Sequence, residues 1–139
     1  MTDMPTVPPE MLTESECWRL LRTVDLGRIA IAPAGGGVEI FPVNFVVDHG
    51  TIVFRTAAGT KLSGVDIASE IAFEADDSDL VEGVAWSVVV KGDAGTIRGH
   101  TDVFDAFDLK LQPWYSSSKP FFVRLVPNAT SGRRFVRSS

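Results

Sequence analysis

The segment "VEIFPVNFVVDHGTIVFRTAAGTKL", residues 38–62, decides the fold of this chain. Its first ten residues fall on two alternating faces, which predicts a long strand. The tripeptide DHG (48–50) predicts a hairpin turn, and TIVFRT (51–56) predicts the return strand. The expected faces of the first strand are Glu39, Phe41, Val43 and Phe45 on one side, and Ile40, Pro42, Asn44 and Val46 on the other.

Two residues of the first strand are unusual. Pro42 has no N–H to give to a neighbouring strand, so we expect a bulge or a sheet edge there. Asn44 has apolar neighbours in sequence, and a half-buried amide must hydrogen-bond to something. Two interpretations stay open for Asn44: a backbone partner across a bulge at Pro42, or the polar edge of a bound flat ring.

The return strand ends in residues suited to an anion. Arg55 and Thr56 end the strand, Gly59 frees the backbone, and Thr60 and Lys61 are expected to open a helix. Backbone N–H groups at a helix N-terminus favour an anion, and a lysine and a hydroxyl add donors. The alternative is a surface turn with solvated charges. The segment lacks the upstream glycine of a P-loop, but its strand-to-helix context favours a phosphate.

Upstream of this hairpin we expect an arm and a helix. Residues 1–12 contain three prolines and little periodicity, which predicts a flexible N-terminal arm. In residues 13–27, Thr13 and Glu16 have the spacing of a capping box, and an apolar face follows at helical spacing. Gly27 is expected to end the helix.

Further segments have strand-like patterns bounded by turn residues, and Gly92 and Gly95 are expected bulge points. A loop that enters a short helix is expected over residues 59–69, and a second short helix over residues 101–111. Hairpins dominate, so the prediction is one mainly β domain over residues 13–139, an antiparallel, partly open barrel. The further strands are RIAIA (28–32), IAFEA (71–75), VAWSVVVKGDAGTIRG (84–99), FFVRLVP (121–127) and, after an NATSG turn, GRRFV (132–136).

Composition excludes several functions. The net charge of −5 over 139 residues argues against general nucleic-acid binding. Acidic residues 70–82 are expected to be a solvated loop, and the C-terminal arginines a basic edge. Cys17 is the single cysteine, and neither a long apolar run nor a signal peptide is seen, so a cytoplasmic location is expected. A chain of this size hardly encloses a deep cavity, so a cofactor pocket is expected between subunits.

Candidate reactive groups are few. His49 and His100 have no ligand-spaced partners, so no metal site is predicted. No nucleophile arrangement is seen, and any chemistry would come from a bound cofactor. Trp86 is expected in the core. Trp114 lies in a polar loop, QPWYSSS (112–118), where it would cap a ligand or a partner subunit, or else close the barrel end.

Taken together, "RIAI…PVNFVVDHGTIVFRTAAGTKL", "WSVVVKG" and "PW…FFVRLVPNATSGRRF" resemble the pyridoxamine 5'-phosphate oxidase-like family of flavin-binding split β-barrels, in its small actinobacterial form. The resemblance covers residues 12–137. It implies a six-stranded antiparallel split β-barrel with an N-terminal helix and short interspersed helices. It also implies a homodimer with two cofactor sites at the subunit interface.

The resemblance also implies site residues. The strand "PVNF" would run along the isoalloxazine ring, and the loop "RTAAGTK" would hold the ribityl chain and the phosphate. Thr60 stands where the true oxidases have an arginine, and Ser87 where they have a glutamine. The cofactor-binding residues expected on this basis are Pro42, Val43, Asn44, Phe45, Arg55, Thr56, Gly59, Thr60, Lys61, Ser87 and Trp114.

These departures predict an FMN-dependent oxidoreductase of unknown small substrate and not a pyridoxamine phosphate oxidase. The redox step on a flavin needs no protein acid or base, so none is nominated. An F420-dependent reductase is the first alternative, because the C-terminal arginines could hold a longer anionic tail. FAD as the flavin and a non-enzymatic flavin- or haem-binding module are the others.

Overall fold

The structure is a computed structural model that describes residues 8–32, 37–57, 70–97 and 120–137. One helix and seven strands lie in these ranges. The expected helices over 59–69 and 101–111 lie outside them. The elements are β1 Glu10–Met11, α1 Glu14–Leu21, β2 Leu26–Ile31, β3 Glu39–Asp48, β4 Thr51–Ala57, β5 Ile71–Asp79, β6 Val84–Thr96 and β7 Pro120–Val136.

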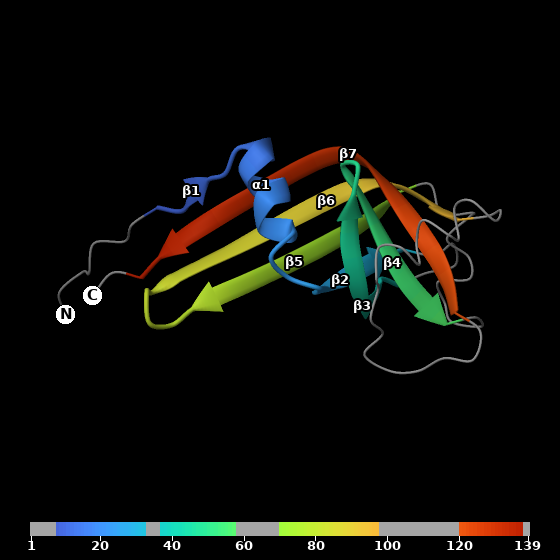
Figure 1. Cartoon of the computed structure of the whole chain (residues 1–139), viewed down its shortest axis with the longest axis horizontal. Helices are drawn as coiled ribbons and strands as arrows, with labels where there is room; N and C mark the ends of the chain where they lie inside the picture. The colour runs from blue at the N-terminus through green and yellow to red at the C-terminus, as the bar shows by residue number, and fades with distance from the viewer. Residues whose placement is uncertain (1–7, 33–36, 58–69, 98–119, 138–139) are drawn as a thin grey trace.

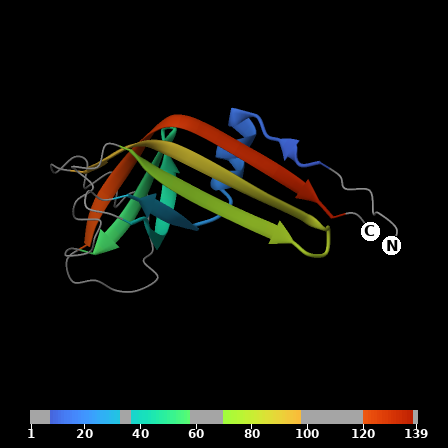
Figure 2. The same cartoon turned by 180° about the vertical axis from the view of Figure 1, so that it is seen from behind.

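Six of the strands form a closed antiparallel barrel. The strand order is β7-β4-β3-β2-β5-β6, and β6 pairs with β7 to close the circle. This confirms the predicted six-stranded barrel. The paired ends of β5, β6 and β7 project away from β2, β3 and β4, as both views show (Figures 1 and 2). Two residues of the expected arm, Glu10 and Met11, pair with Arg134 and Arg133 on the edge of this extension.

The barrel interior is filled by alternate side chains of the strands. Phe45, Phe54 and Phe73 are fully buried there. The rings of Phe45 and Phe73 meet edge to face with centroids 4.7 Å apart. Helix α1 adds Cys17, Trp18 and Leu21 to the same core, and Trp86 packs against it half-buried.

Helix α1 begins as predicted and ends earlier. Thr13 and Glu16 form a capping box, in which the Glu16 N–H donates to Thr13 Oγ1 at 3.2 Å and the Thr13 N–H donates to Glu16 Oε1 at 3.0 Å. The prediction that Gly27 ends the helix is wrong, because the helix stops at Leu21 and Gly27 lies in β2 opposite Val43. A Cβ at Gly27 would lie 2.5 Å from the Phe73 ring, so close packing explains this glycine.

The β3–β4 hairpin is confirmed. His49 and Gly50 form its two-residue loop with φ values of 51° and 72°, as the right-handed twist of a hairpin requires. The period-two pattern of β3 is confirmed at Val43 and Phe45, whose side chains lie on one face of the strand and point into the core.

Strand β7 corrects the prediction most. It runs unbroken from Pro120 to Val136, so the expected NATSG turn is wrong. A register shift opposite Lys91 and Gly92 absorbs the extra residue, which confirms a bulge at Gly92. Gly95 pairs regularly with Arg124, so a bulge there is wrong. Strand β5 likewise continues through Asp79, so part of the expected acidic loop is strand.

A charged cluster fixes the closed end of the β3–β4 hairpin to β7. Arg124 Nη1 donates to Asp48 Oδ2 and to Thr51 Oγ1, both at 2.8 Å. His49 Nδ1 lies 2.7 Å from the other Asp48 oxygen. Burial alone would raise the pKa of Asp48, but the hydrogen bond from Arg124 and the charges of His49 and Arg124 together hold it below its ordinary 3.8.

Gly132 is where α1 packs on β7, and it gives the first prediction. A Cβ there would lie 2.6 Å from Cys17 Sγ and 3.2 Å from the Ser87 carbonyl oxygen. We expect Gly132→Ala to lower the free energy of unfolding in urea by about 1–3 kcal/mol. Gly95→Ala is the control, since nothing lies within 4 Å of its added Cβ. A Gly132→Ala chain as stable as the control would contradict this packing.

The second prediction concerns acid. Because the folded-state pKa of Asp48 is lowered, the ionised Asp48 side chain stabilises the fold above pH 3.8. This stabilisation is lost as the pH falls through the folded-state pKa. We expect Asp48→Asn to lower the free energy of unfolding by about 2 kcal/mol at neutral pH, and by little at strongly acidic pH. Urea titrations at both pH values test this. Glu82→Gln, at an exposed carboxylate between β5 and β6, is the control, and a pH-independent loss in Asp48→Asn would refute the assignment.

Candidate functional site

The barrel is divided along one edge. The β3–β4 ladder runs from Asp48–Thr51 to Phe45–Phe54 and stops there. Beyond that point β3 stays with β2 as far as Glu39, and β4 stays with β7 as far as Ala57. Within the described residues, the segment 39–44 of β3 therefore has a strand on one side only. We call this segment the open edge.

Pro42 lies in the open edge, opposite Arg28 of β2. The Phe45 N–H donates to the Asp25 carbonyl at 3.1 Å, on the β2 side. Because N–H groups alternate along a strand, the N–H missing at position 42 would point away from β2. The predicted edge position of Pro42 is confirmed, and the β2–β3 register shows no bulge there.

Asn44 is the buried polar side chain of the described core, only 7% exposed. Its Nδ2 donates to the Asp25 carbonyl at 3.4 Å, and it takes part in a further interaction. A backbone partner for Asn44 is thus confirmed, although it lies at the start of β2 and not across a bulge. By strand alternation Asn44 shares the outer face of β3 with Pro42 and Val46.

Arg55 is a half-buried cation on the outer face of β4. Arg55 follows Phe54, the last residue of β4 that pairs with β3. Continued by one residue, the β3–β4 register would place Arg55 opposite Asn44, but the two strands have separated there. A second apolar cluster on this outer face consists of Val53, Ile97 and Phe122, with Val46 packed against it. The part of the chain that the structure describes offers Arg55 no carboxylate. A cation held at an opened sheet edge is chemically suited to an anion.

The other predicted site residues are placed differently. The side chains of Val43 and Phe45 face the barrel core, 5% and 1% exposed, so only their backbone reaches the open edge. Thr56 follows Arg55 in β4, opposite Phe121. Ser87 lies on β6 opposite Asp76 and Arg133, and β5 and β2 stand between it and β3. Gly59, Thr60, Lys61 and Trp114 lie outside the described residues.

One charged group beside the open edge could not be identified from the sequence patterns. Arg28, the cross-strand neighbour of Pro42, donates from Nη2 to Glu74 Oε1 at 3.1 Å and pairs with Asp76 Oδ1 at 2.8 Å. The hydrogen bond with Asp76 is the main reason that the pKa of Arg28 is raised. The alternation of β2 predicts an outward Arg28, but its acidic partners depend on the distant β2–β5 pairing.

Within the described ranges no group of three or more histidine, cysteine or acidic side chains could hold a metal ion. None of the described helices is long and apolar enough to span a bilayer. The open edge, with Asn44 and Arg55 on either side of the parted strands, is the candidate site.

Comparison with known proteins agrees with this fold. A candidate pyridoxamine 5'-phosphate oxidase from Corynebacterium glutamicum is 36% identical, covers 99% of this chain with 100% of its own, and superposes with a TM-score of 0.82. An FAD-binding protein from Mycobacterium smegmatis is 44% identical over 91% of this chain and 99% of its own, with a TM-score of 0.77. An uncharacterized Mycobacterium tuberculosis protein is 33% identical over 92% of this chain and 86% of its own.

The profile of the family described as pyridoxamine 5'-phosphate oxidase matches residues 13–134, which is nearly the whole described barrel. The match confirms the resemblance carried by the open-edge strand and its neighbours. This chain belongs to the pyridoxamine 5'-phosphate oxidase family.

Proposed function

We propose that this chain is a flavin-binding protein and, as a homodimer in the cytoplasm, an FMN-dependent oxidoreductase acting on a small substrate. The observation that carries the proposal is Arg55, a half-buried cation that faces the parted strands without a carboxylate partner in the described ranges. A desolvated guanidinium is stable when it binds an anion, and a phosphate supplies one.

The residues divide between the two ends of such a cofactor. Arg55 and Thr56 would hold the ribityl chain and the phosphate, together with Gly59, Thr60 and Lys61. The open edge would support the ring through the backbone from Pro42 to Phe45 and through the amide of Asn44. Trp114 would contact the ring. Two strands, β2 and β5, stand between Ser87 and β3, so Ser87 would serve the site of the second chain.

A bound flavin supplies hydride or single-electron transfer, and the chain supplies binding and orientation. Pro42 contributes no N–H toward the open side, so at this position the backbone offers only its carbonyl oxygen. Asn44 keeps one bond to Asp25, which fixes its amide plane. We assign no proton transfer to the protein.

FMN is the cofactor we propose first, because it carries a single phosphate group, which Arg55 and Lys61 would hold. A similar protein from Mycobacterium smegmatis binds FAD, which makes FAD the closest alternative. F420 is the second candidate, favoured by the exposed arginines Arg133, Arg134 and Arg137 at the end of β7. Haem gains no support from His49, which is exposed and paired with Asp48 in a turn.

The first test is the cofactor itself. We expect freshly purified protein to show flavin absorption bands, and the stripped protein to bind FMN in equilibrium dialysis more tightly than FAD or F420. Uptake of F420 and of no flavin would instead support the alternative function, an F420-dependent reductase. Protein that takes up none of these, or that shows a haem Soret band, would refute flavin binding.

The third prediction tests the phosphate assignment. A charge-assisted contact contributes about 1.5–3 kcal/mol, so Arg55→Gln should weaken FMN binding at least roughly tenfold. Lys61→Ala should do the same. The readout is quenching of flavin fluorescence, with riboflavin as a second ligand that lacks the phosphate and should lose little affinity.

Arg19→Gln in the exposed last turn of α1 is the matched control and should bind FMN like the wild type. Equal losses for FMN and riboflavin in Arg55→Gln would place Arg55 at the ring and not at the phosphate.

A further inference from the structure

The projecting ends of β5 and β6 carry an open hollow of about 450 Å³, on the far side of β2 from the open edge (Figure 1). We call this space the hollow. Its walls combine carboxylates, one indole ring and aliphatic side chains, and they are formed by Asp77, Ser78, Asp79, Leu80, Val84 and Trp86. A concave surface that joins an aromatic ring with a few convergent polar groups has the composition of a small-ligand site.

The β5–β6 register brings these side chains to one face of the sheet. Asp77 lies opposite Trp86, and Asp79 lies opposite Val84. Directly opposite residues of an antiparallel pair share a face, and so do residues two apart along a strand. Trp86 is half-buried and packs against the barrel core, which holds its ring in place. The hollow therefore has a fixed aromatic wall with a carboxylate as its cross-strand neighbour.

The two carboxylates of the hollow are oriented by the backbone and keep their charge available. Asp77 Oδ1 accepts the N–H of Ser78 at 2.8 Å. Asp79 Oδ1 accepts the N–H groups of Val81 and Glu82, both at 3.0 Å. These bonds use one of the two oxygens of each carboxylate. Within the part of the chain that the structure describes, neither carboxylate forms an ion pair.

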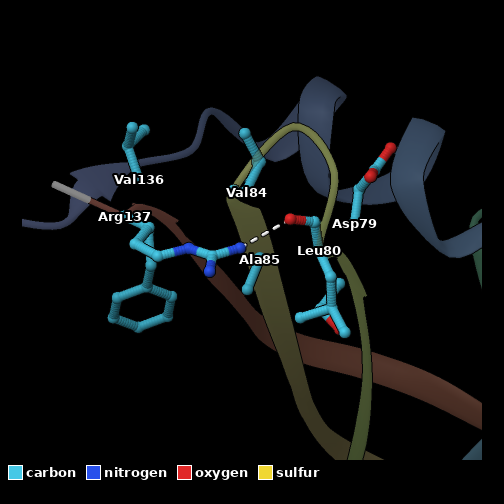
Figure 3. Close-up of a pocket in the computed structure, with 9 residues that line it drawn as sticks. Asp79, Leu80, Val84, Ala85, Val136 and Arg137 are labelled. Atoms are coloured by element: carbon cyan, nitrogen blue, oxygen red, sulfur yellow. Dashed lines mark hydrogen bonds between the residues drawn. The ribbon is translucent and has the colours of Figure 1, made fainter. Parts of the chain in front are cut away.

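Arg137 reaches the same turn but is bonded elsewhere. Its Nη2 donates to the Leu80 carbonyl at 2.6 Å, and its backbone N–H donates to the Gly83 carbonyl at 2.7 Å. Figure 3 shows the bond to Leu80, with the Asp79 carboxylate pointing away from the Arg137 guanidinium. Arg137 lines a smaller neighbouring pocket of about 210 Å³ and not the hollow. The hollow is therefore acidic.

The chemistry of these walls selects an organic cation. A cation is attracted to the face of an indole ring, and nearby carboxylates add to that attraction. Leu80 and Val84 offer apolar contact to alkyl groups. The same carboxylates repel an anion. Within the described ranges no group of three or more histidine, cysteine or acidic side chains could hold a metal ion. An alkylammonium group, which is both charged and apolar, matches all of the walls.

We propose that the hollow binds an alkylammonium group, with its cation on the Trp86 ring and beside the Asp77 and Asp79 carboxylates. The group arrives on a free small molecule or as a lysine side chain of another protein. The assignment is independent of the proposed flavin site, because the hollow and the open edge share no residue. Since the hollow is open to solvent, we expect a Kd on the order of 1 mM.

Choline and neohexyl alcohol test the need for a charge, because the alcohol has the same shape with a carbon atom in place of the nitrogen. Each is titrated into the full chain at constant ionic strength. The indole N–H signal of Trp86, assigned by through-bond correlation, is followed by NMR. We expect choline to shift this signal saturably and to bind at least about tenfold more tightly than the alcohol. No saturable shift with choline, or equal affinity for the two compounds, would overturn the proposal.

A variant supplies the second measurement. Asp77→Asn keeps an acceptor for the Ser78 N–H and removes the charge, so the Kd for choline should rise about threefold to fivefold. Glu82→Gln is the matched control, since it removes an exposed carboxylate of the same turn that does not line the hollow. Equal losses in the two variants would show an effect of net charge alone and overturn the site.

The source of the cation is read from a third ligand, N-acetyl-lysine methylamide, titrated in the same way. Tighter binding of this compound than of choline supports a lysine side chain of another protein as the natural occupant. Tighter binding of choline supports a free small molecule. Failure of both compounds to bind rejects the proposal and leaves the proposed flavin site untouched, since flavin uptake is measured separately.

Discussion

The closed barrel depends on β7, which pairs with β4 along one edge and with β6 along the other. The first part of β7 binds β4, from Ala57–Pro120 to Ile52–Leu125, while most of β7 binds β6. This double pairing closes the barrel, because β6 and β4 have no other common neighbour. The register shift at Gly92 lets a single strand of 17 residues follow both partners. Toward Glu39, β3 stays paired with β2, and toward Ala57, β4 stays paired with β7. The strands β3 and β4 therefore separate beyond the Phe45–Phe54 pair.

That separation creates the open edge, and two features of the sequence make it tolerable. An unpaired strand edge is prone to join other strands, and a proline without an N–H limits this. Asn44 is kept in place by the Asp25 carbonyl at the start of β2. At the other end of the same hairpin, Arg124 joins Asp48 and Thr51 to β7. The β3–β4 hairpin is thus held to β7 at its turn, and its two strands separate at the opposite end.

The sequence correctly predicted features that depend on a few neighbouring residues. These are the capping box of α1, the hairpin loop at His49–Gly50 and the edge position of Pro42. The continuity of β7 was missed because Pro127, Asn128 and Gly132 favour turns, and the pairing with β6 that overrides them involves residues far away in the sequence. Long-range pairing likewise gives Arg28 its carboxylates and separates Ser87 from β3. At the candidate site, the structure places Asn44 and Arg55 on either side of the parted strands, and their role as cofactor contacts stays a prediction.

The distribution of cations bears on the choice of cofactor. Arg55 stands at the open edge on β4, which pairs with the first residues of β7, whereas Arg133, Arg134 and Arg137 lie at the opposite end of β7. A cofactor with one phosphate needs the first of these groups. A cofactor with a longer anionic tail also needs the second, and within one chain the barrel separates them.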